Sequence, residues 1–184
     1  MNDLAAEADA VLRSADCLHD AVAVQRAYDQ LAHEITLQYA SLNPLLLCVM
    51  IGGVVPTVEI SKRLTLAFEL DYLHATRYRG ATKGGGLIWK RQQDKAVAGR
   101  HVLVIDDILD EGNTLAAIRK ALTDFRPASL RVAVLAEKVH DRRVEGAHAE
   151  FIGLKVEDRY VFGCGMDYKE YWRQLPAIYA VGGK

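Results

Sequence analysis

The chain has 184 residues, of which 51% are hydrophobic and 26% charged, with 23 Lys and Arg against 24 Asp and Glu. This length is typical of one globular domain with its own core, and the balanced charge gives no basic field for a nucleic acid or a membrane surface. The three cysteines lie far apart without a C-x-x-C motif, and the apolar run at residues 44–51 is too short to span a membrane. The N-terminus is acidic and unlike a secretory signal, so we expect a cytoplasmic protein.

The first third of the chain predicts helix, strand and helix. Residues 1–41 are rich in alanine and place apolar side chains three and four positions apart, which favours helix. Asn43-Pro44 ends this pattern, and the apolar run at residues 45–51 is typical of a strand that is buried on both faces. Pro56 begins a second expected helix, which extends to about Leu70.

The remaining chain alternates in the same way. A polar segment follows at residues 77–100, and we assign no ligand to its Gly84–Gly86 run. Beyond it the pattern predicts strands at 101–105 and 130–136, with a helix at 115–125 between them. This order predicts a single α/β domain with a parallel, twisted sheet flanked by helices. We expect a core at about residues 40–150 and a small hood from the aromatic-rich residues 151–184, with the N-terminal segment as a candidate second part.

An acidic string follows the predicted strand at residues 101–105. Asp106 and Asp107 end the strand, and a loop at residues 110–114 leads into the next helix, so that four carboxylates lie within residues 106–111. In a parallel sheet this loop lies at the carboxyl edge, where ligands bind. Free N–H groups at a helix start favour a phosphate, and crowded carboxylates need cations or sugar hydroxyls. Ordinary turn and N-cap chemistry uses the same residue types, so both interpretations remain open at this point.

Two motifs resemble those of a known family. Residues 104–114, VIDDILDEGNT, resemble the phosphoribosyl-diphosphate motif of type I phosphoribosyltransferases. Residues 160–176, YVFGCGMDYKEYWRQLP, are similar to the C-terminal signature of hypoxanthine–guanine phosphoribosyltransferases. The resemblance covers about residues 45–178. It implies the type I phosphoribosyltransferase fold, a Mg²⁺ cofactor, and a purine-salvage reaction that makes inosine or guanosine monophosphate and pyrophosphate from hypoxanthine or guanine and phosphoribosyl diphosphate.

The resemblance also implies a role for each matching residue. Asp110 corresponds to a general acid/base beside purine N7. The implied phosphoribosyl-diphosphate ligands are Asp106, Asp107, Glu111, Gly112, Asn113, Thr114, Ile51, Gly52 and Arg173. The implied purine ligands are Lys138, which donates to the 6-oxo group, Tyr160, which stacks on the base, Val161 and Asp167. The implied Mg²⁺ ligands are Asp106, Asp107 and Asp167, and Arg77 and Tyr78 correspond to the tip of a mobile lid.

The chain departs from the family pattern at three of these positions. Ile51 replaces a lysine that is common in the pyrophosphate loop, so binding there must use the backbone. Arg77 replaces the serine of the lid, and Asp106 stands where many relatives have glutamate. The loop around Ile51 often contains a non-proline cis peptide in the family. The six histidines show no metal-binding spacing and are assigned to the surface or the core.

Two other functions remain alternatives. The first is a phosphoribosyltransferase for another nucleobase, xanthine, adenine or a pyrimidine, although Lys138 argues against adenine, whose 6-amino group needs no cationic donor. The second is a non-catalytic regulator that senses phosphoribosyl diphosphate. The same residues also have purely structural interpretations. In these, Lys138 is a surface lysine, Tyr160 packs against the core or its rim, and Asp167 and Arg173 form a surface pair. The resemblance further implies a homodimer or homotetramer and no nucleic-acid or membrane partner.

Charge is segregated along the chain despite its balanced total. Residues 77–100 hold seven basic residues against one acid, Asp94, whereas residues 106–111 hold four acids and no base. This pattern predicts an acidic floor for Mg²⁺ and ribose, which faces a basic lid over phosphates.

Overall fold

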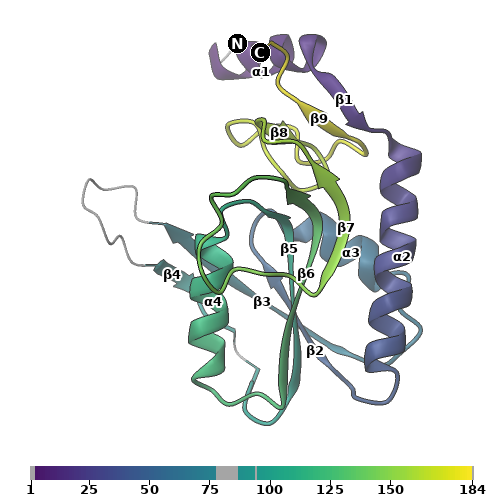
Figure 1. Ribbon diagram of the computed structural model, residues 1–184, viewed down its shortest axis with the longest axis vertical. Coiled ribbons are helices and arrows are strands. Elements are labelled where there is room, and N and C mark those ends of the chain that lie inside the picture. Colours follow the sequence, from purple (N-terminus) through teal and green to yellow (C-terminus); the bar gives the residue numbers. More distant parts are fainter. Residues whose placement is uncertain (1–2, 78–86, 94, 184) are drawn as a thin grey trace.

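A six-stranded sheet forms the centre of the computed structural model, which describes residues 3–77, 87–93 and 95–183 (Figure 1). Its strands are β2 (Leu45–Val49), β3 (Glu69–Arg77), β4 (Leu87–Arg91), β5 (His101–Leu109), β6 (Ser129–Lys138) and β7 (Phe151–Val156). Their order is β4–β3–β2–β5–β6–β7, and every neighbouring pair is parallel except β3 and β4. The predicted α/β fold around a mostly parallel sheet is confirmed.

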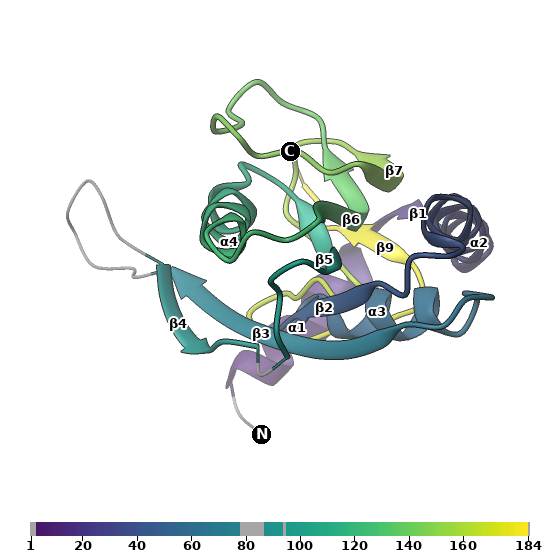
Figure 2. The ribbon, with the colours of Figure 1, turned by 90° about the horizontal axis from the view of Figure 1, so that it is seen from below.

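Helices cover both faces of this sheet (Figure 2). The helices α2 (Ala21–Tyr39) and α3 (Val54–Ser61) lie on one face, and α4 (Asn113–Thr123) lies on the other. Because side chains alternate along a strand, Leu103 and Ile105 of β5 pack in one cluster with Leu31 of α2, whereas Val104 packs in a second cluster with Ile118 of α4. In the described part of the chain, no helix is long and apolar enough to cross a membrane.

A second, antiparallel sheet forms the hood. Its strands are β1 (Asp16–His19), β9 (Ile178–Ala180) and β8 (Val161–Phe162), in that spatial order. The hood lies beyond the carboxyl ends of β5, β6 and β7 (Figure 1). Helix α1 (Asp3–Ser14) packs against it, where the Trp172 indole donates a hydrogen bond to the Ala8 carbonyl at 2.8 Å. The main sheet continues to Val156, beyond the core boundary of about residue 150 that we expected.

Three elements differ from the sequence expectation. Strand β1 interrupts the helix expected over residues 1–41, because it pairs with β9 near the other end of the chain. The second helix ends at Ser61 rather than near Leu70, and Glu69 begins β3, which pairs with β2. Strand β5 continues to Leu109, because its pairing with β6 persists to Leu109 and Glu137. Asp106 and Asp107 therefore lie within the strand rather than at its end.

Candidate active site

A cavity of about 350 Å³ opens at the carboxyl ends of β2 and β5, beside the start of α4. The predicted phosphoribosyl-diphosphate ligands that line it are Gly52, Asp106, Asp107, Glu111, Gly112, Asn113, Thr114 and Arg173, together with Asp110. The side chain of Ile51 is largely outside, because this residue is 46% exposed while its neighbours Met50 and Gly52 line the cavity. Residues from three separate parts of the chain therefore meet at one edge of the sheet.

The start of α4 presents uncapped backbone N–H groups to this cavity. Gly112 precedes the helix with φ of 82°, and no side chain caps the first turn. A Cβ atom at Gly112 would lie 2.3 Å from the Ala147 Cβ, so both the space and the backbone angle require glycine here. The Val144 N–H donates to the Glu111 carbonyl at 2.9 Å and anchors the loop. Free N–H groups and the helix dipole together make this a site for an anion.

Asp106 and Asp107 form a buried carboxyl pair on the floor of the cavity. Their residues are 8% and 9% exposed. The Asp107 N–H donates to Asp106 Oδ1 at 2.9 Å, and the Ile108 N–H donates to Asp107 Oδ1 at 2.7 Å. Burial raises the pKa of both carboxyls, and the charge of Asp107 raises the pKa of Asp106 further. Within the described ranges neither carboxyl makes an ion pair, so the pair favours a bound cation.

We expect the metal-free protein to become more stable when this pair loses one charge. A carboxyl whose pKa is higher in the folded than in the unfolded chain binds more protons when folded, so the free energy of unfolding falls as pH rises above about 4. In EDTA at pH 7, Asp106→Asn should therefore melt above the wild type by on the order of 3 °C. The difference should vanish as the pH approaches about 4. Thermal melts monitored by circular dichroism test this, and a lower melting temperature for the variant at pH 7 contradicts it.

The loop after β2 and a loop of the hood enclose the acid pair. The peptide between Met50 and Ile51 is cis, as in the resembled loop. A Cβ atom at Gly52 would lie 2.1 Å from Asp107 Oδ2, and one at Gly165 would lie 2.2 Å from the Gly52 carbonyl oxygen. Only glycines allow these segments to approach so closely.

A second cavity of about 200 Å³ adjoins the first and shares Asp107, Ile108 and Asp110 with it. The four predicted purine ligands Lys138, Tyr160, Val161 and Asp167 line it, together with Met166. The walls thus come from β5, the end of β6 and the hood. The structure brings all predicted purine ligands together beside Asp110, although the hood residues are distant from Asp110 in the sequence.

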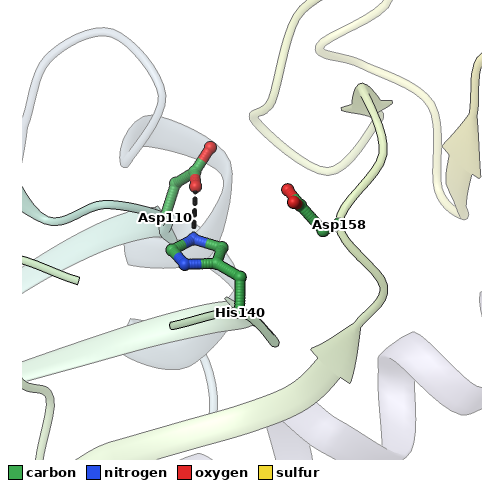
Figure 3. Close-up of side chains that lie close together, drawn as sticks. All are labelled: Asp110, His140 and Asp158. Carbon is green, nitrogen blue, oxygen red and sulfur yellow. Dashed lines mark hydrogen bonds and ion pairs between the residues drawn. The ribbon is translucent and has the colours of Figure 1, made fainter. Parts of the chain in front are cut away.

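Asp110 lies between the two cavities and accepts two hydrogen bonds. Lys138 Nζ donates to its Oδ2 at 2.7 Å, and His140 Nε2 lies 2.7 Å from its Oδ1 (Figure 3). Burial raises the pKa of Asp110, but the hydrogen bonds from Lys138 and His140 and the charge of Lys138 outweigh burial and hold the pKa below its usual value. Asp110 is therefore a carboxylate at neutral pH.

His140 contacts the predicted site residue Asp110, a role that the sequence did not indicate for any histidine. Its side chain is 4% exposed, and it lies two residues after Lys138, just beyond β6. The sequence signal for His140 is its position just after a predicted strand. In a parallel sheet the carboxyl ends of neighbouring strands lie at one edge, so a residue there lies near the end of β5. Ala75 of β3 and Met166 of the hood also line the cavities without a preceding sequence signal.

The hood holds an aromatic ring and a guanidinium at the two cavities. Tyr160 is 51% exposed, and its ring makes a T-shaped contact with the ring of Tyr168, with the centroids 5.5 Å apart and the planes at 69°. Arg173 donates to the Gly165 carbonyl and pairs with Asp167 Oδ1, each at 2.7 Å. A half-exposed aromatic ring therefore lines the smaller cavity, and a guanidinium lines the larger one.

The lid residues are only partly described. Arg77 ends β3, and Ala75 of the same strand lines the larger cavity. Tyr78 and Gly84–Gly86 lie outside the described residues.

The combined geometry fits a phosphorylated sugar beside a planar base. The larger cavity offers an anion site, a carboxyl pair and a guanidinium. The smaller offers an ammonium group and an exposed ring. A carboxylate with two donors lies at their junction, where a bond between sugar and base would form.

Comparisons with known proteins agree with this geometry. The model of the phosphoribosyl transferase domain matches residues 14–170. The hypoxanthine-guanine-xanthine phosphoribosyltransferase of Tritrichomonas foetus is 34% identical over 155 residues, which are 84% of this chain and 85% of that protein. The hypoxanthine-guanine phosphoribosyltransferase of Streptococcus pneumoniae (strain ATCC BAA-255 / R6) is 33% identical over 156 residues, or 84% and 86% of the two chains.

A solved structure of a hypoxanthine-guanine-xanthine phosphoribosyltransferase superimposes with a TM-score of 0.83 at 30% identity, and the match covers 91% of this chain and 97% of that one. A hypoxanthine phosphoribosyltransferase from Staphylococcus aureus gives a TM-score of 0.86 at 25% identity over 98% and 96% of the chains. Both the family model and the relatives span most of the sequence. This chain therefore belongs to the phosphoribosyltransferase family, as the two sequence motifs predicted.

Proposed function

We propose that this protein transfers the phosphoribosyl group of phosphoribosyl diphosphate to hypoxanthine or guanine and releases pyrophosphate. The observation that carries the proposal is the pair of adjoining cavities, which share Asp107 and Asp110. One cavity supplies the groups that a phosphorylated, hydroxylated donor needs, and the other supplies those of a 6-oxopurine. The names of the relatives at 33–34% identity support the same reaction.

The donor occupies the larger cavity in this proposal. Its 5-phosphate accepts hydrogen bonds from the backbone N–H groups at residues 111–114, where the uncapped start of α4 lies. Asp106 and Asp107 hold the ribose hydroxyls. Arg173 and the backbone of Ile51 and Gly52 bind the pyrophosphate. Positive charge near this group stabilises the charge that develops on it as it leaves.

Magnesium fits the chemistry of the groups on the cavity floor. Asp106, Asp107 and Asp167 supply carboxylate oxygens, the ligands that Mg²⁺ prefers. The first two are buried, and in the part of the chain that the structure describes neither makes an ion pair. We propose that these three residues hold the ion, in part through water or the substrate. When bound, the ion supplies neutralising charge for the pyrophosphate.

The base occupies the smaller cavity. Lys138 Nζ donates to the 6-oxo group, the exposed ring of Tyr160 stacks on the purine, and Val161 and Asp167 contact its edge. As the bond from ribose C1 to the pyrophosphate oxygen breaks, purine N9 forms a bond with C1. Asp110 takes the proton that leaves N7, so charge and protons balance.

A nucleobase assay tests the proposal. The protein is incubated with phosphoribosyl diphosphate, Mg²⁺ and hypoxanthine, guanine, xanthine, adenine or uracil in turn, and nucleotide formation is followed by chromatography. We expect turnover of hypoxanthine or guanine, and loss of turnover in EDTA. Turnover of adenine or uracil alone assigns the protein to another branch of the family. Tight donor binding without turnover of any base supports the non-catalytic regulator instead.

Gly52→Ala should weaken donor binding. The added methyl group would lie 2.1 Å from Asp107 Oδ2 and must displace that carboxylate from the cavity floor. We expect the Mg²⁺-dependent affinity for phosphoribosyl diphosphate to fall by about tenfold or more, the equivalent of one lost hydrogen bond to a charged group. Isothermal titration calorimetry measures this. Gly99→Ala is the control for affinity: a Cβ atom there meets no atom within 4 Å and Gly99 lines neither cavity, so its φ of 69° lowers the stability of the variant without changing the donor site. Equal affinity of the two variants contradicts the prediction.

A homodimer or homotetramer and a cytoplasmic location stay predictions. Light scattering on the purified chain at several concentrations measures the first. A lid role for Arg77 and Tyr78 is likewise proposed from the resemblance alone.

A further inference from the structure

His140 makes a specific contact with the carboxylate at the junction of the two cavities. Figure 3 shows its ring directed at Asp110, with Asp158 beside the two residues on a separate segment of the chain. The imidazole side chain is 4% exposed, whereas that of Asp110 is 41% exposed. A nearly buried imidazole is thus in contact with a partly exposed carboxylate.

The hydrogen bonds of the ring determine which nitrogen carries its proton. The backbone N–H of Arg142 donates to His140 Nδ1 at 3.1 Å. An N–H group can only donate, so Nδ1 is an acceptor without a proton. The ring proton is therefore on Nε2, which donates it to Asp110 Oδ1 at 2.7 Å.

The two carboxylate oxygens of Asp110 have different donors. Lys138 holds Oδ2 at 2.7 Å, and His140 holds Oδ1 at the same distance. In the proposed reaction Lys138 also donates to the purine 6-oxo group, so its bond to Asp110 weakens or breaks when the base binds. His140 does not line the smaller cavity and keeps its bond. After the base binds, His140 is then the donor that still orients the carboxylate.

The same residues do not favour a metal ion. Ligand atoms of Asp110, His140 and Asp158 lie within 4.8 Å of one another. However, the Arg142 guanidinium binds both oxygens of Asp158, at 2.6 and 2.9 Å, and Lys138 Nζ lies 4.0 Å from Asp158. Cationic side chains thus already neutralise both carboxylates, and a divalent ion here would be repelled by them.

We propose that His140 is a positioning residue, which orients the Asp110 carboxylate toward purine N7 and keeps it ionised after Lys138 turns to the base. This inference rests on the proposed transfer reaction. The charged and titratable groups around Asp110 are Lys138 from β6, His140, Arg142 and Asp158 from the segments after β6 and β7, and Glu111 from its own loop. Lys138 and His140 are the two groups that donate hydrogen bonds to its carboxylate.

Two variants at His140 separate the hydrogen bond from the bulk of the ring. His140→Leu removes the donor, so we expect kcat to fall by about tenfold to a hundredfold, as for a lost hydrogen bond to a charged group. The donor favours the ionised form of Asp110, so its loss should also raise the pH of the acidic limb of the kcat profile by about one unit. His140→Gln, whose amide can donate from a similar position, should recover most of both changes. KM for phosphoribosyl diphosphate should stay unchanged in both variants.

The control variant is His148→Gln, at an exposed histidine that pairs with Glu150 away from both cavities. It should behave as the wild type. Equal losses in the Leu and Gln variants, or an unchanged pH profile in His140→Leu, overturn the proposal.

A measurement on the resting protein tests the inference without turnover. Nitrogen-15 NMR of the wild type at pH 7 should show His140 with a proton on Nε2 and none on Nδ1, and Asp110→Asn should shift the Nε2 signal. A proton on Nδ1 overturns the inference, even if the protein is an active transferase. If no nucleobase is turned over but the NMR result is as expected, the proposed function is overturned and the contact has no catalytic role. Failure of the proposed function and failure of this inference are therefore distinguishable.

Discussion

Asp110→Asn is expected to lower kcat for nucleotide formation by about a hundredfold to ten-thousandfold, the usual contribution of a general base. The carboxylate lies where both cavities meet, and its pKa is held below the usual value by Lys138 and His140 despite partial burial. It can therefore accept a proton at neutral pH, whereas an amide of the same shape cannot. Steady-state kinetics with hypoxanthine and guanine measure the effect.

Binding of the donor should survive this substitution. The uncapped helix start and the carboxyl pair that form the donor site do not depend on the charge of Asp110. We expect the dissociation constant for phosphoribosyl diphosphate with Mg²⁺ to change less than about threefold, within the context dependence of a single lost contact. Asp124→Asn, at the exposed end of α4, is the control and should leave kcat unchanged. An active Asp110→Asn variant removes this residue from the proton transfer.

The parts of the fold that the sequence predicts well have local signals. The apolar runs that became β2, β5 and β6 are buried on both faces, and burial on both faces requires such continuous runs. The anion site at the start of α4 also depends on a short stretch of chain, with Gly112 at its centre. Because these features need only neighbouring residues, their prediction from a single sequence is reliable.

The remaining features depend on partners that are distant in the sequence. Strand β1 has only four residues and exists because β9 pairs with it. Strand β3 exposes Leu70 and Tyr72 and buries Leu73 and Ala75, so apolar side chains lie on both of its faces and no alternation of apolar and polar residues marks it as a strand. His140 acquires its role from Asp110, which lies 30 positions earlier. Local periodicity contains no information about any of these pairings.

The resemblance identified the purine ligands that periodicity could not place. Lys138 and Tyr160 lie on different elements, yet both line the smaller cavity. A single lysine at a strand end and a single exposed tyrosine have no distinctive pattern by themselves. Their grouping follows from the packing of the hood over β5 and β6.

The second large effect is expected at Lys138. Lys138→Met keeps the length of the side chain but removes the ammonium group that we assign to the 6-oxo oxygen. The carbonyl of a bound purine then loses its charged partner, and kcat/KM for hypoxanthine or guanine should fall by about a hundredfold or more. Lys120→Met, at an exposed lysine on α4, is the matched control and should leave kcat/KM unchanged.

Lys138 also donates to Asp110, so a loss of activity alone does not identify which contact matters. Product affinity separates the two, because no proton moves when a nucleotide binds. If Lys138 recognises the oxygen, Lys138→Met should weaken binding of inosine monophosphate by about tenfold or more while leaving adenosine monophosphate nearly unchanged, since the latter has no oxygen at this position. If Lys138 acts only through Asp110, both affinities should change equally. Fluorescence titrations of the two nucleotides therefore decide whether this lysine selects the base or only tunes the carboxylate beside it.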